Sequence, residues 1–327
     1  MNKLLILGQL LFCSSALAVA PQVSSLKAET PITLSGPAGK FDFMGADQAM
    51  SRILAAHRGS KTLEIIDLKS GKALKAIEVG AAQGVAVDSR NHKYFLGNEG
   101  DHSVAIVDSQ SLQKTAEVKV DGPVDAIAFD DKNGMLFAAE DDGDHLWVID
   151  TKSAKVVGTV SIPGVPEVLD FDPATNRIYL NIKDKNTVVR VDPSTDKVNA
   201  TWSTLPATSP HGLVIDSKRG RVYSAGGNGK LVSIDFKSGK VISSADIPTG
   251  VDQIAFDTER QLIYSACKGF ISITAVSDHG LKTVGQVASP KGAHTLAVDP
   301  SSHDVWVSYA DEKQSYLQKF KASTSNE

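Results

Sequence analysis

Short apolar runs separated by polar turn residues recur along almost the whole chain. An apolar residue, then Asp, then a bulky residue seven places later returns at intervals of 41, 42, 42, 44, 41 and 42 residues. The Asp positions are Asp47, Asp88, Asp130, Asp172, Asp216, Asp257 and Asp299. The bulky residues are Leu54, Phe95, Phe137, Tyr179, Tyr223, Tyr264 and Trp306. Self-similarity at a fixed period indicates a repeat architecture.

Each repeat predicts four short β-strands. In the second repeat, apolar and β-branched runs cover Gly84–Val87, Tyr94–Asn98, Val104–Val107 and Glu117–Val120, with turn residues between them. A second apolar-Asp pair recurs in five repeats, at Asp67, Asp108, Asp150, Asp192 and Asp235. Four short strands in about 42 residues are typical of a β-propeller blade. The sequence therefore predicts an all-β, seven-bladed β-propeller with four-stranded antiparallel blades.

The last repeat is incomplete. It has three predicted strands, the last ending near Phe320, and lacks a fourth. The segment Thr30–Gly36 precedes the first repeat and resembles the fourth strands elsewhere, such as Ala76–Gly80. We therefore expect an N-terminal strand to complete the last blade and close the ring, which removes open sheet edges. This predicts one propeller domain over residues 29–321, with an N-terminal segment at 19–28 and a tail at 322–327.

Two of the predicted strands resemble a known repeat. Arg177–Asn181 and Lys93–Asn98 are similar to the Tyr-Val-Thr-Asn strand of bacterial YVTN-type seven-bladed propellers, and the Val-Asp or Ile-Asp pairs with Ser-Gly-Lys fit that family. The resemblance covers roughly residues 29–321. It implies kinship with lactonase-type propellers and the haem d1 domain of nitrite reductase. Because family members include ligand binders, surface-layer proteins and lactonase-like proteins, the resemblance selects a fold and not a function.

The first residues are typical of a secretory signal. Lys3 precedes an apolar run, Leu4–Phe12, which small residues follow. Ala16-Leu17-Ala18 predicts cleavage after Ala18, so that residues 1–18 are the signal peptide. No other stretch is long and apolar enough to span a bilayer. We therefore expect a periplasmic or secreted protein.

Composition excludes several classes of function. Lys and Arg number 34 and Asp and Glu 38, for a net charge of −4, whereas dedicated nucleic-acid binders carry a basic excess. With only Cys13 and Cys267, the chain cannot build a disulfide framework, a Cys-rich zinc site or an iron–sulfur cluster. We expect no nucleic-acid partner, and a monomer, because a closed propeller needs no second copy.

The innermost strand of each blade is expected to begin at the mouth of the central channel. The residue five places before each repeat Asp is polar in all seven blades: Asp42, Gln83, Asp125, Glu167, His211, Asp252 and His294. The residue ten places after the Asp ends the second strand, which antiparallel pairing returns to the same face. His57 and Glu140 stand at this second position. We predict a ligand-binding mouth formed by the seven residues and Glu140.

A divalent metal ion is one candidate ligand of this mouth. His57, Asp42 and His294 lie on the neighbouring first and last blades, and two imidazoles with a carboxylate suit a transition metal. Asp252 is placed to join them or to orient a ligand. The simpler alternative is a mouth whose polar groups bind only water and strand ends. No cofactor is established by the sequence, and no short His-x-x-x-His spacing supports a metal.

Three other patterns have structural explanations. An Asp directly after a strand caps the following turn, so the repeat Asp residues are expected to build hairpins. The acidic loop Glu140–His145 does not match an EF-hand, and we interpret it as a solvated loop rather than a calcium site. A lone thiol such as Cys267 is usually an inert small apolar residue.

Two classes of function remain. The favoured interpretation is a binding or scaffold protein for a small molecule or a protein partner at the mouth. The alternative is a lactonase-like hydrolase or lyase, in which water bound to a metal at His57, Asp42 and His294 attacks an ester or lactone. The sequence does not decide whether the protein is an enzyme.

Overall fold

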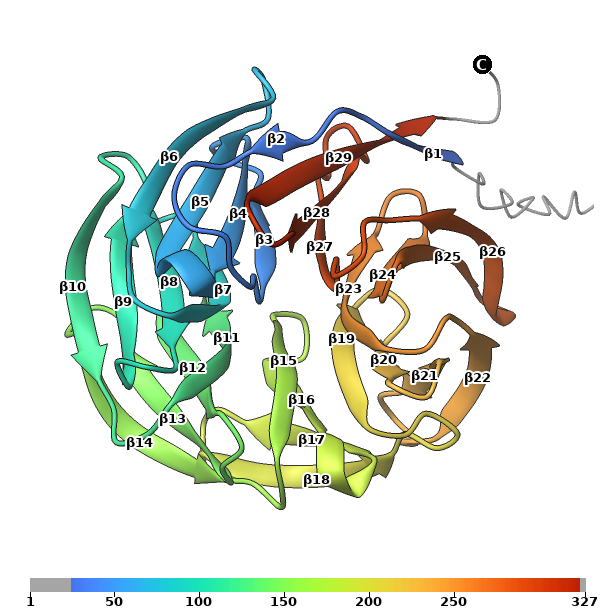
Figure 1. Ribbon diagram of the computed structural model, residues 1–327. Coiled ribbons are helices and arrows are strands. Elements are labelled where there is room, and N and C mark those ends of the chain that lie inside the picture. Colours follow the sequence, from blue (N-terminus) through green and yellow to red (C-terminus); the bar gives the residue numbers. More distant parts are fainter. Residues whose placement is uncertain (1–24, 324–327) are drawn as a thin grey trace, which may run out of the picture.

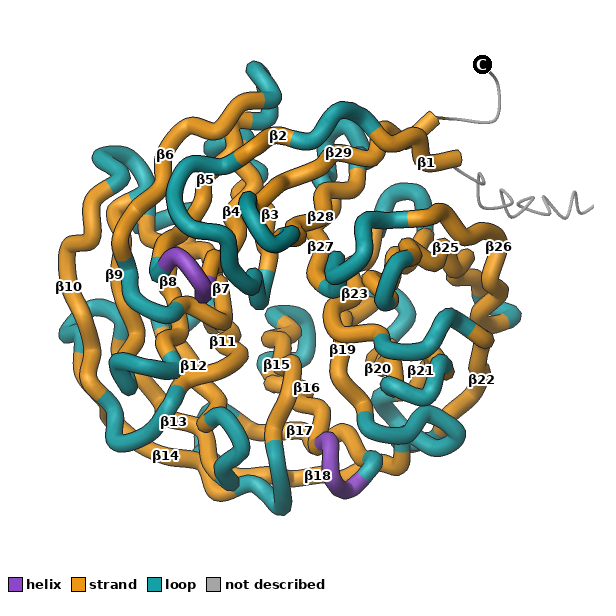
Figure 2. The backbone as a smooth tube through the Cα atoms, viewed as in Figure 1, coloured by secondary structure: helices purple, strands orange, loops and turns teal. Residues whose placement is uncertain are grey.

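Seven antiparallel sheets stand around a central axis in the computed structural model, which describes residues 25–323 (Figure 1). The predicted signal peptide, 1–18, and the cleavage after Ala18 lie outside the described residues. Within them, the only helical segments are two 3-10 turns, Arg58–Ser60 and Lys183–Lys185. In the tube view of Figure 2 these turns are the two short purple segments. No helix of the described part of the chain is long and apolar enough to cross a membrane.

Each of the first six blades is one four-stranded sheet, read from the channel outward in chain order. Blades one to three are β3 (Met44–Asp47), β4 (Arg52–His57), β5 (Thr62–Asp67), β6 (Lys72–Glu78); β7 (Ala82–Asp88), β8 (Lys93–Asn98), β9 (Ser103–Asp108), β10 (Gln113–Lys119); and β11 (Val124–Asp130), β12 (Met135–Glu140), β13 (His145–Asp150), β14 (Lys155–Ser161). Blades four to six are β15 (Pro166–Asp172), β16 (Arg177–Ile182), β17 (Thr187–Asp192), β18 (Lys197–Ser203); β19 (Pro210–Asp216), β20 (Arg221–Gly226), β21 (Lys230–Asp235), β22 (Val241–Asp246); and β23 (Val251–Asp257), β24 (Leu262–Cys267), β25 (Phe270–Ser277), β26 (Gly280–Ala288). This confirms the predicted all-β, seven-bladed fold.

The repeat Asp residues cap the hairpins between the first and second strands. The Oδ1 atom of Asp47 accepts a hydrogen bond from the Met50 backbone N–H at 3.1 Å, and that of Asp88 accepts one from Asn91 at 3.0 Å. The same contact, to a residue two or three places on, recurs in the other five blades. The second set of Asp residues caps the outer hairpins in the same way. Asp235 Oδ1, for example, accepts a hydrogen bond from the Ser238 backbone N–H at 2.7 Å. These carboxylates therefore satisfy turn backbone and build the repeat.

Apolar side chains from neighbouring blades pack face to face. The seven bulky repeat residues are all buried: Leu54, Phe95, Phe137, Tyr179, Tyr223, Tyr264 and Trp306. Their clusters cross blade boundaries; one, for example, joins Leu54 and Leu63 of blade one to Tyr94 and Leu96 of blade two. Each blade thus buries both faces only against its two neighbours.

The N-terminal segment completes blade seven. This blade contains β27 (Thr295–Val298), β28 (Val305–Ala310) and β29 (Ser315–Ser323), and both β1 (Ser25–Ala28) and β2 (Ile32–Thr33) pair antiparallel with β29. Figure 1 shows β1 and β2 side by side with β29. The main pairing, Ser25 with Ser323 to Ala28 with Phe320, lies earlier in the chain than the predicted 30–36 segment. Leu26 explains this position, because it is buried in the core between blades six and seven.

The side-chain amide of Gln253 joins blades six, seven and one near the channel. The Gln253 side chain of blade six accepts hydrogen bonds from the backbone N–H of Met44 at 3.1 Å and from Leu296 at 3.3 Å, and also contacts the Thr295 hydroxyl. Its Nε2 atom donates to the Met44 carbonyl at 2.8 Å. Since Met44 belongs to blade one and Leu296 to blade seven, Gln253 links the two ends of the ring.

We expect Leu26→Ala to reduce the free energy of unfolding by about 2–3 kcal/mol, because it removes buried apolar volume from the closing strand. Urea unfolding followed by circular dichroism measures this change. The control Leu74→Ala lies on the outer strand β6, where the side chain is 48% exposed, and should change stability by less than about 0.5 kcal/mol. Equal effects of the two substitutions would contradict a closure that depends on Leu26.

Candidate functional site

Six of the seven predicted mouth residues act on one another electrostatically. Asp42 precedes β3 and His294 precedes β27, while the others stand in β11, β15, β19 and β23. Burial and then the negative charge of Asp252 raise the pKa of Asp42. The hydrogen bond with Asp252 raises the pKa of His294, and the charge of Asp42 adds to that shift. The structure therefore brings these side chains from different blades within electrostatic reach of one another.

Carboxylates dominate this group. Burial, then the charge of Asp252, raises the pKa of Asp42 to about 7. Burial raises the pKa of Asp125 well above its usual range, and the charges of Asp42, Glu167, Asp141 and Asp252 add to the shift. Burial also raises the pKa of Glu167. The mouth concentrates negative charge in a site where water screens it poorly.

Asp252 and His294 form the closest pair at the mouth. The His294 Nδ1 atom lies 2.6 Å from the Asp252 Oδ2 atom. Burial opposes ionisation of Asp252, but this hydrogen bond and the charge of His294 outweigh it and lower the pKa of Asp252. The same hydrogen bond raises the pKa of His294. The pair therefore holds a carboxylate with a positive imidazole as pH falls toward the histidine range.

Glu167, His211 and Asp252 form a compact group on blades four, five and six. One ligand atom from each lies within 4.8 Å of the other two. The His211 Nδ1 atom lies 2.7 Å from the Ser209 carbonyl oxygen, and the Lys183 ammonium contacts Glu167 Oε1. A nitrogen and two oxygens that converge in this way have the composition of a metal-binding or cation-binding site.

An aromatic side chain crosses the channel next to this polar group. Phe43 follows Asp42 on blade one, yet it packs against the apolar clusters that contain Ala126 of blade three and Val168 of blade four. The first cluster lies between blades three and four and the second between blades four and five, and blade four lies across the ring from blade one (Figure 1). Phe43 therefore places an apolar side chain next in sequence to the mouth residue Asp42.

Charged residues that sequence reasoning did not select also reach the mouth. Arg58 lies 3.9 Å from Asp42 and contacts Glu99, while the Gln83 Nε2 atom donates to Asp141 at 3.2 Å. Arg58, Glu99, Asp141 and Lys183 are all eleven residues after a repeat Asp. The repeat spacing therefore identifies these residues at position eleven after the repeat Asp, one residue beyond the predicted position ten. Successive residues at a strand end point to opposite sides, so this offset decides which side chain meets the mouth.

His57 does not join Asp42 and His294 in a metal site. Its side chain is fully buried, stacks on Phe41 with a 4.1 Å centroid separation, and contacts Ser315 Oγ through Nε2 at 2.9 Å and Glu64 through Nδ1 at 3.4 Å. The Nε2 contact thus joins blade one to β29 of blade seven, and the Nδ1 contact stays within blade one. The expected trio is absent from the two groups of potential metal ligands that lie together within residues 25–323.

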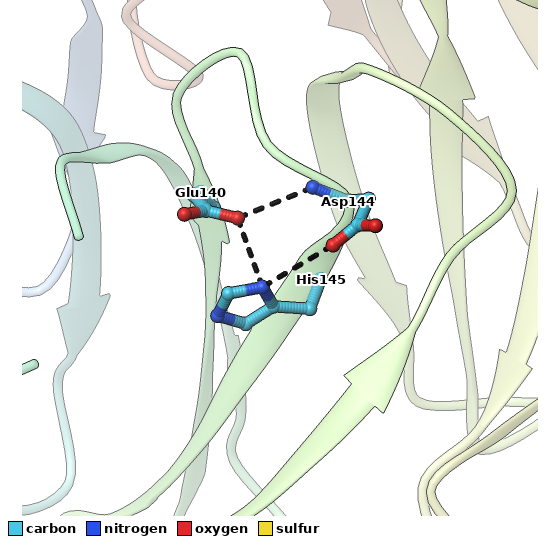
Figure 3. Close-up of side chains that lie close together, drawn as sticks. All are labelled: Glu140, Asp144 and His145. Carbon is cyan, nitrogen blue, oxygen red and sulfur yellow. Dashed lines mark hydrogen bonds and ion pairs between the residues drawn. The ribbon is translucent and has the colours of Figure 1, made fainter. Parts of the chain in front are cut away.

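Glu140 turns toward its own hairpin rather than into the channel. Figure 3 shows its Oε2 atom beside His145 Nδ1, at 2.8 Å, and beside the Asp144 backbone N–H, at 3.2 Å. The His145 Nδ1 atom is also 3.6 Å from Asp144. Glu140 ends the second strand of blade three, where the side chain belongs to the loop between β12 and β13. It is therefore not part of the carboxylate group at the mouth.

Burial raises the pKa of two further groups, the Cys267 thiol and the Asp170 carboxyl. Cys267 is buried, and burial raises the pKa of its thiol to about 12, which agrees with an inert apolar role. Asp170 stands on the innermost strand β15, where the matching residues of other blades are small or apolar, such as Ala86 and Ala128. Burial raises the pKa of Asp170 to about 7.

Comparison with known proteins identifies the fold alone. Comparison of the sequence with protein-family models gives no match, and comparison with curated proteins gives none. The structure is similar to a chain of Kuenenia stuttgartiensis hydrazine synthase, with a TM-score of 0.75, 13% identity, and coverage of 90% of this chain and 97% of that one. It is also similar to a chain of a mitotic checkpoint complex, with a TM-score of 0.79, 14% identity, and coverage of 98% and 99%. A hydrazine synthase and a mitotic checkpoint complex are very different proteins, yet both contain this fold. The fold therefore does not identify a function.

The pKa of Asp42 predicts a pH-dependent effect of Asp42→Asn. A carboxyl whose pKa is raised on folding contributes stability below its unfolded pKa, near 4, and loses that contribution as pH rises through about 7. The Asn variant should therefore gain stability over the wild type between pH 4 and 8, by roughly 2 kcal/mol at the upper end. Urea unfolding across this range measures the difference.

Asp235→Asn serves as a control of opposite sign. Hydrogen bonds from Ser238 lower the pKa of Asp235, so this carboxylate stabilises the fold above its unfolded pKa. The Asn variant should lose stability relative to the wild type as pH rises through 4. A pH-independent effect of Asp42→Asn would show that the Asp42 carboxyl does not titrate at a raised pKa.

Proposed function

We propose that this chain is an exported binding protein whose channel mouth holds a small cationic ligand. A seven-bladed propeller is consistent with a binding or scaffold role. The observation that carries the proposal is the convergence of five carboxylates from four blades on one polar mouth. These carboxylates belong to Asp42, Asp125, Asp141, Glu167 and Asp252, and the apolar side chain of Phe43 follows Asp42 in the chain.

The charge balance favours a cation. Three side chains are in ion pairs with mouth carboxylates: Arg58, Lys183 and, when protonated, His294. Arg58 is also paired with Glu99 and Lys183 with Asp142, both outside the ring. Burial is the largest cause of the raised pKa of Asp42 and of Asp125, and repulsion from neighbouring carboxylates adds to both shifts. A bound cation would relieve this repulsion in a poorly screened site. A phosphate-rich ligand such as DNA would increase it, so nucleic acid is not part of the proposal.

Family and location belong to the same proposal. The Tyr-Leu-Asn strand of blade four and the Ser-Gly-Lys turns support membership of the YVTN-type propellers, and the Lys3 and Leu4–Phe12 pattern supports export by a cleaved signal. We infer that the protein acts as a monomer in the periplasm or outside the cell, because the closed ring leaves no sheet that needs a second chain.

A lactonase-like hydrolase is the second candidate. The observation that favours it is the 2.6 Å contact between Asp252 and His294, since a carboxylate that accepts from Nδ1 leaves Nε2 to take a proton from water. His57 has no part in this reaction, because it is buried away from the mouth.

The binding proposal is tested with a panel of cations, namely putrescine, choline, Ca²⁺ and Co²⁺. At least one should raise the thermal unfolding temperature of the wild type, because binding to the folded state alone stabilises it. The shift should fall by at least about half in the Asp42→Asn/Asp125→Asn variant, since each carboxylate contributes attraction. The control Asp131→Asn pairs with Arg90 beside the Asp130 turn and should keep the full shift. The proposal fails if no cation shifts the wild type, or if the mouth variant responds like the control.

The hydrolase candidate is tested with γ-butyrolactone and p-nitrophenyl acetate. Turnover should fall about 100-fold or more in His294→Ala, since a positioned general base typically contributes at least that factor. The control His145→Ala should keep full activity, because this imidazole lies in the blade-three hairpin. Absence of turnover by the wild type would remove this candidate.

A further inference from the structure

We propose that the cation held at the mouth is a divalent transition-metal ion, and that Glu167, His211 and Asp252 are its ligands. This inference rests on the proposed binding function and names the class of ligand and the side chains that hold it. It replaces the trio expected from sequence, in which His57 is buried elsewhere.

The three side chains come from equivalent positions of consecutive blades. Glu167, His211 and Asp252 stand near the start of the innermost strands β15, β19 and β23, each five residues before its repeat Asp. Neighbouring inner strands pack side by side around the ring, which brings one ligand atom of each residue within 4.8 Å of the others. An ion at the centre of such a triangle needs only small adjustments of side-chain torsions to reach ordinary metal–ligand distances of about 2.0–2.2 Å.

Each proposed ligand is held through one atom by a neighbour outside the trio. Lys183 contacts Glu167 Oε1, and His294 Nδ1 contacts Asp252 Oδ2 at 2.6 Å. The Ser209 carbonyl lies 2.7 Å from His211 Nδ1. Each contact uses one atom of the ligand, so we infer that Glu167 Oε2, Asp252 Oδ1 and His211 Nε2 are the atoms that bind the metal ion.

The contact with Ser209 also determines the state of the His211 ring. A carbonyl oxygen only accepts, so His211 Nδ1 must be the donor and carry the proton. In the neutral ring Nε2 then bears the lone pair that a metal requires. A histidine held by a backbone carbonyl on the far nitrogen is the arrangement that orients metal-binding imidazoles in proteins.

The donor set favours a transition metal over calcium or magnesium. Calcium and magnesium prefer all-oxygen sites, whereas an imidazole nitrogen with carboxylates suits zinc, cobalt, nickel or iron. Three protein ligands leave coordination positions open toward the mouth for water or a further ligand. The charges of Asp42 and Asp125, which act on this group, add attraction for a doubly charged ion.

The second group with suitable side chains is less fit for a metal. Glu140, Asp144 and His145 come from one hairpin, and the contacting atoms of Glu140 and His145 lie 2.8 Å apart, so the ion would have to break that hydrogen bond (Figure 3). The Asp144 side chain is 80% exposed to water. These residues therefore provide the matched control for the mouth.

The test is a Co²⁺ titration of the untagged protein, followed by visible absorption and by calorimetry. We expect one ion per chain, with the absorption bands of a nitrogen-coordinated and oxygen-coordinated site. Affinity should fall at least 10-fold in His211→Ala and in Glu167→Gln, each of which removes a ligand. His294→Ala should weaken binding 10-fold to 100-fold, because it removes a partner that orients Asp252. His145→Ala should bind Co²⁺ as the wild type does.

The outcomes separate this inference from the proposed function. Binding of putrescine or choline without Co²⁺ would overturn the metal site and keep the cationic mouth. Binding of Co²⁺ that survives His211→Ala but is lost in His145→Ala would place the ion in the blade-three hairpin and also overturn it. If no cation of the panel binds, both proposals fail. Glu167→Gln preserves the side-chain shape, and its unfolding curve distinguishes a lost ligand from a lost fold.

Discussion

Each blade of this protein can bury its two apolar faces only against the blades on either side, so every part of the structure depends on closure of the ring. Six blades are built from one continuous stretch of chain each, and the seventh is completed by residues from the opposite end. Leu26 brings the N-terminal strand into the core between blades six and seven, and Gln253 ties blades six, seven and one together near the channel. The ring is thus closed by two kinds of contact: apolar packing of Leu26 in the outer part and hydrogen bonds of Gln253 near the channel.

Closure is also what creates the mouth. The inner strands begin at the same level of the ring, so polar residues that are about 42 positions apart in sequence become neighbours. The arrangement has an electrostatic cost, because Asp42, Asp125 and Glu167 all have a raised pKa in the folded chain. Functional sites commonly carry such destabilising charge, which a bound ligand compensates. The stability of the ring and the affinity of the mouth are therefore linked through the same carboxylates.

Particular residues show how far the sequence predicted the site. Position five before each repeat Asp selected six titratable side chains that lie within electrostatic reach of one another, because the inner strands keep one register throughout the repeat. The position at the end of the second strand selected two residues that lie elsewhere: His57 is buried against β29, and Glu140 contacts His145 of its own hairpin. A shift of one residue would have selected Arg58, Asp141 and Lys183. The pattern of apolar residues does not resolve such an offset at a strand end, where the chain leaves the sheet and turns.

Four features follow from the amino-acid sequence alone: the number of blades, their order, the Asp-capped turns and the set of polar residues at the start of each inner strand. These features are local, because they follow from strand periodicity and turn chemistry that repeat in every unit. Three others required the folded ring. Ligand atoms of Glu167, His211 and Asp252 come within 4.8 Å of one another, Phe43 packs against the cluster between blades three and four, and the closing strand contains Leu26. Those facts depend on distances across the ring, and a repeat pattern specifies what each blade contributes without specifying which side chains meet at the centre.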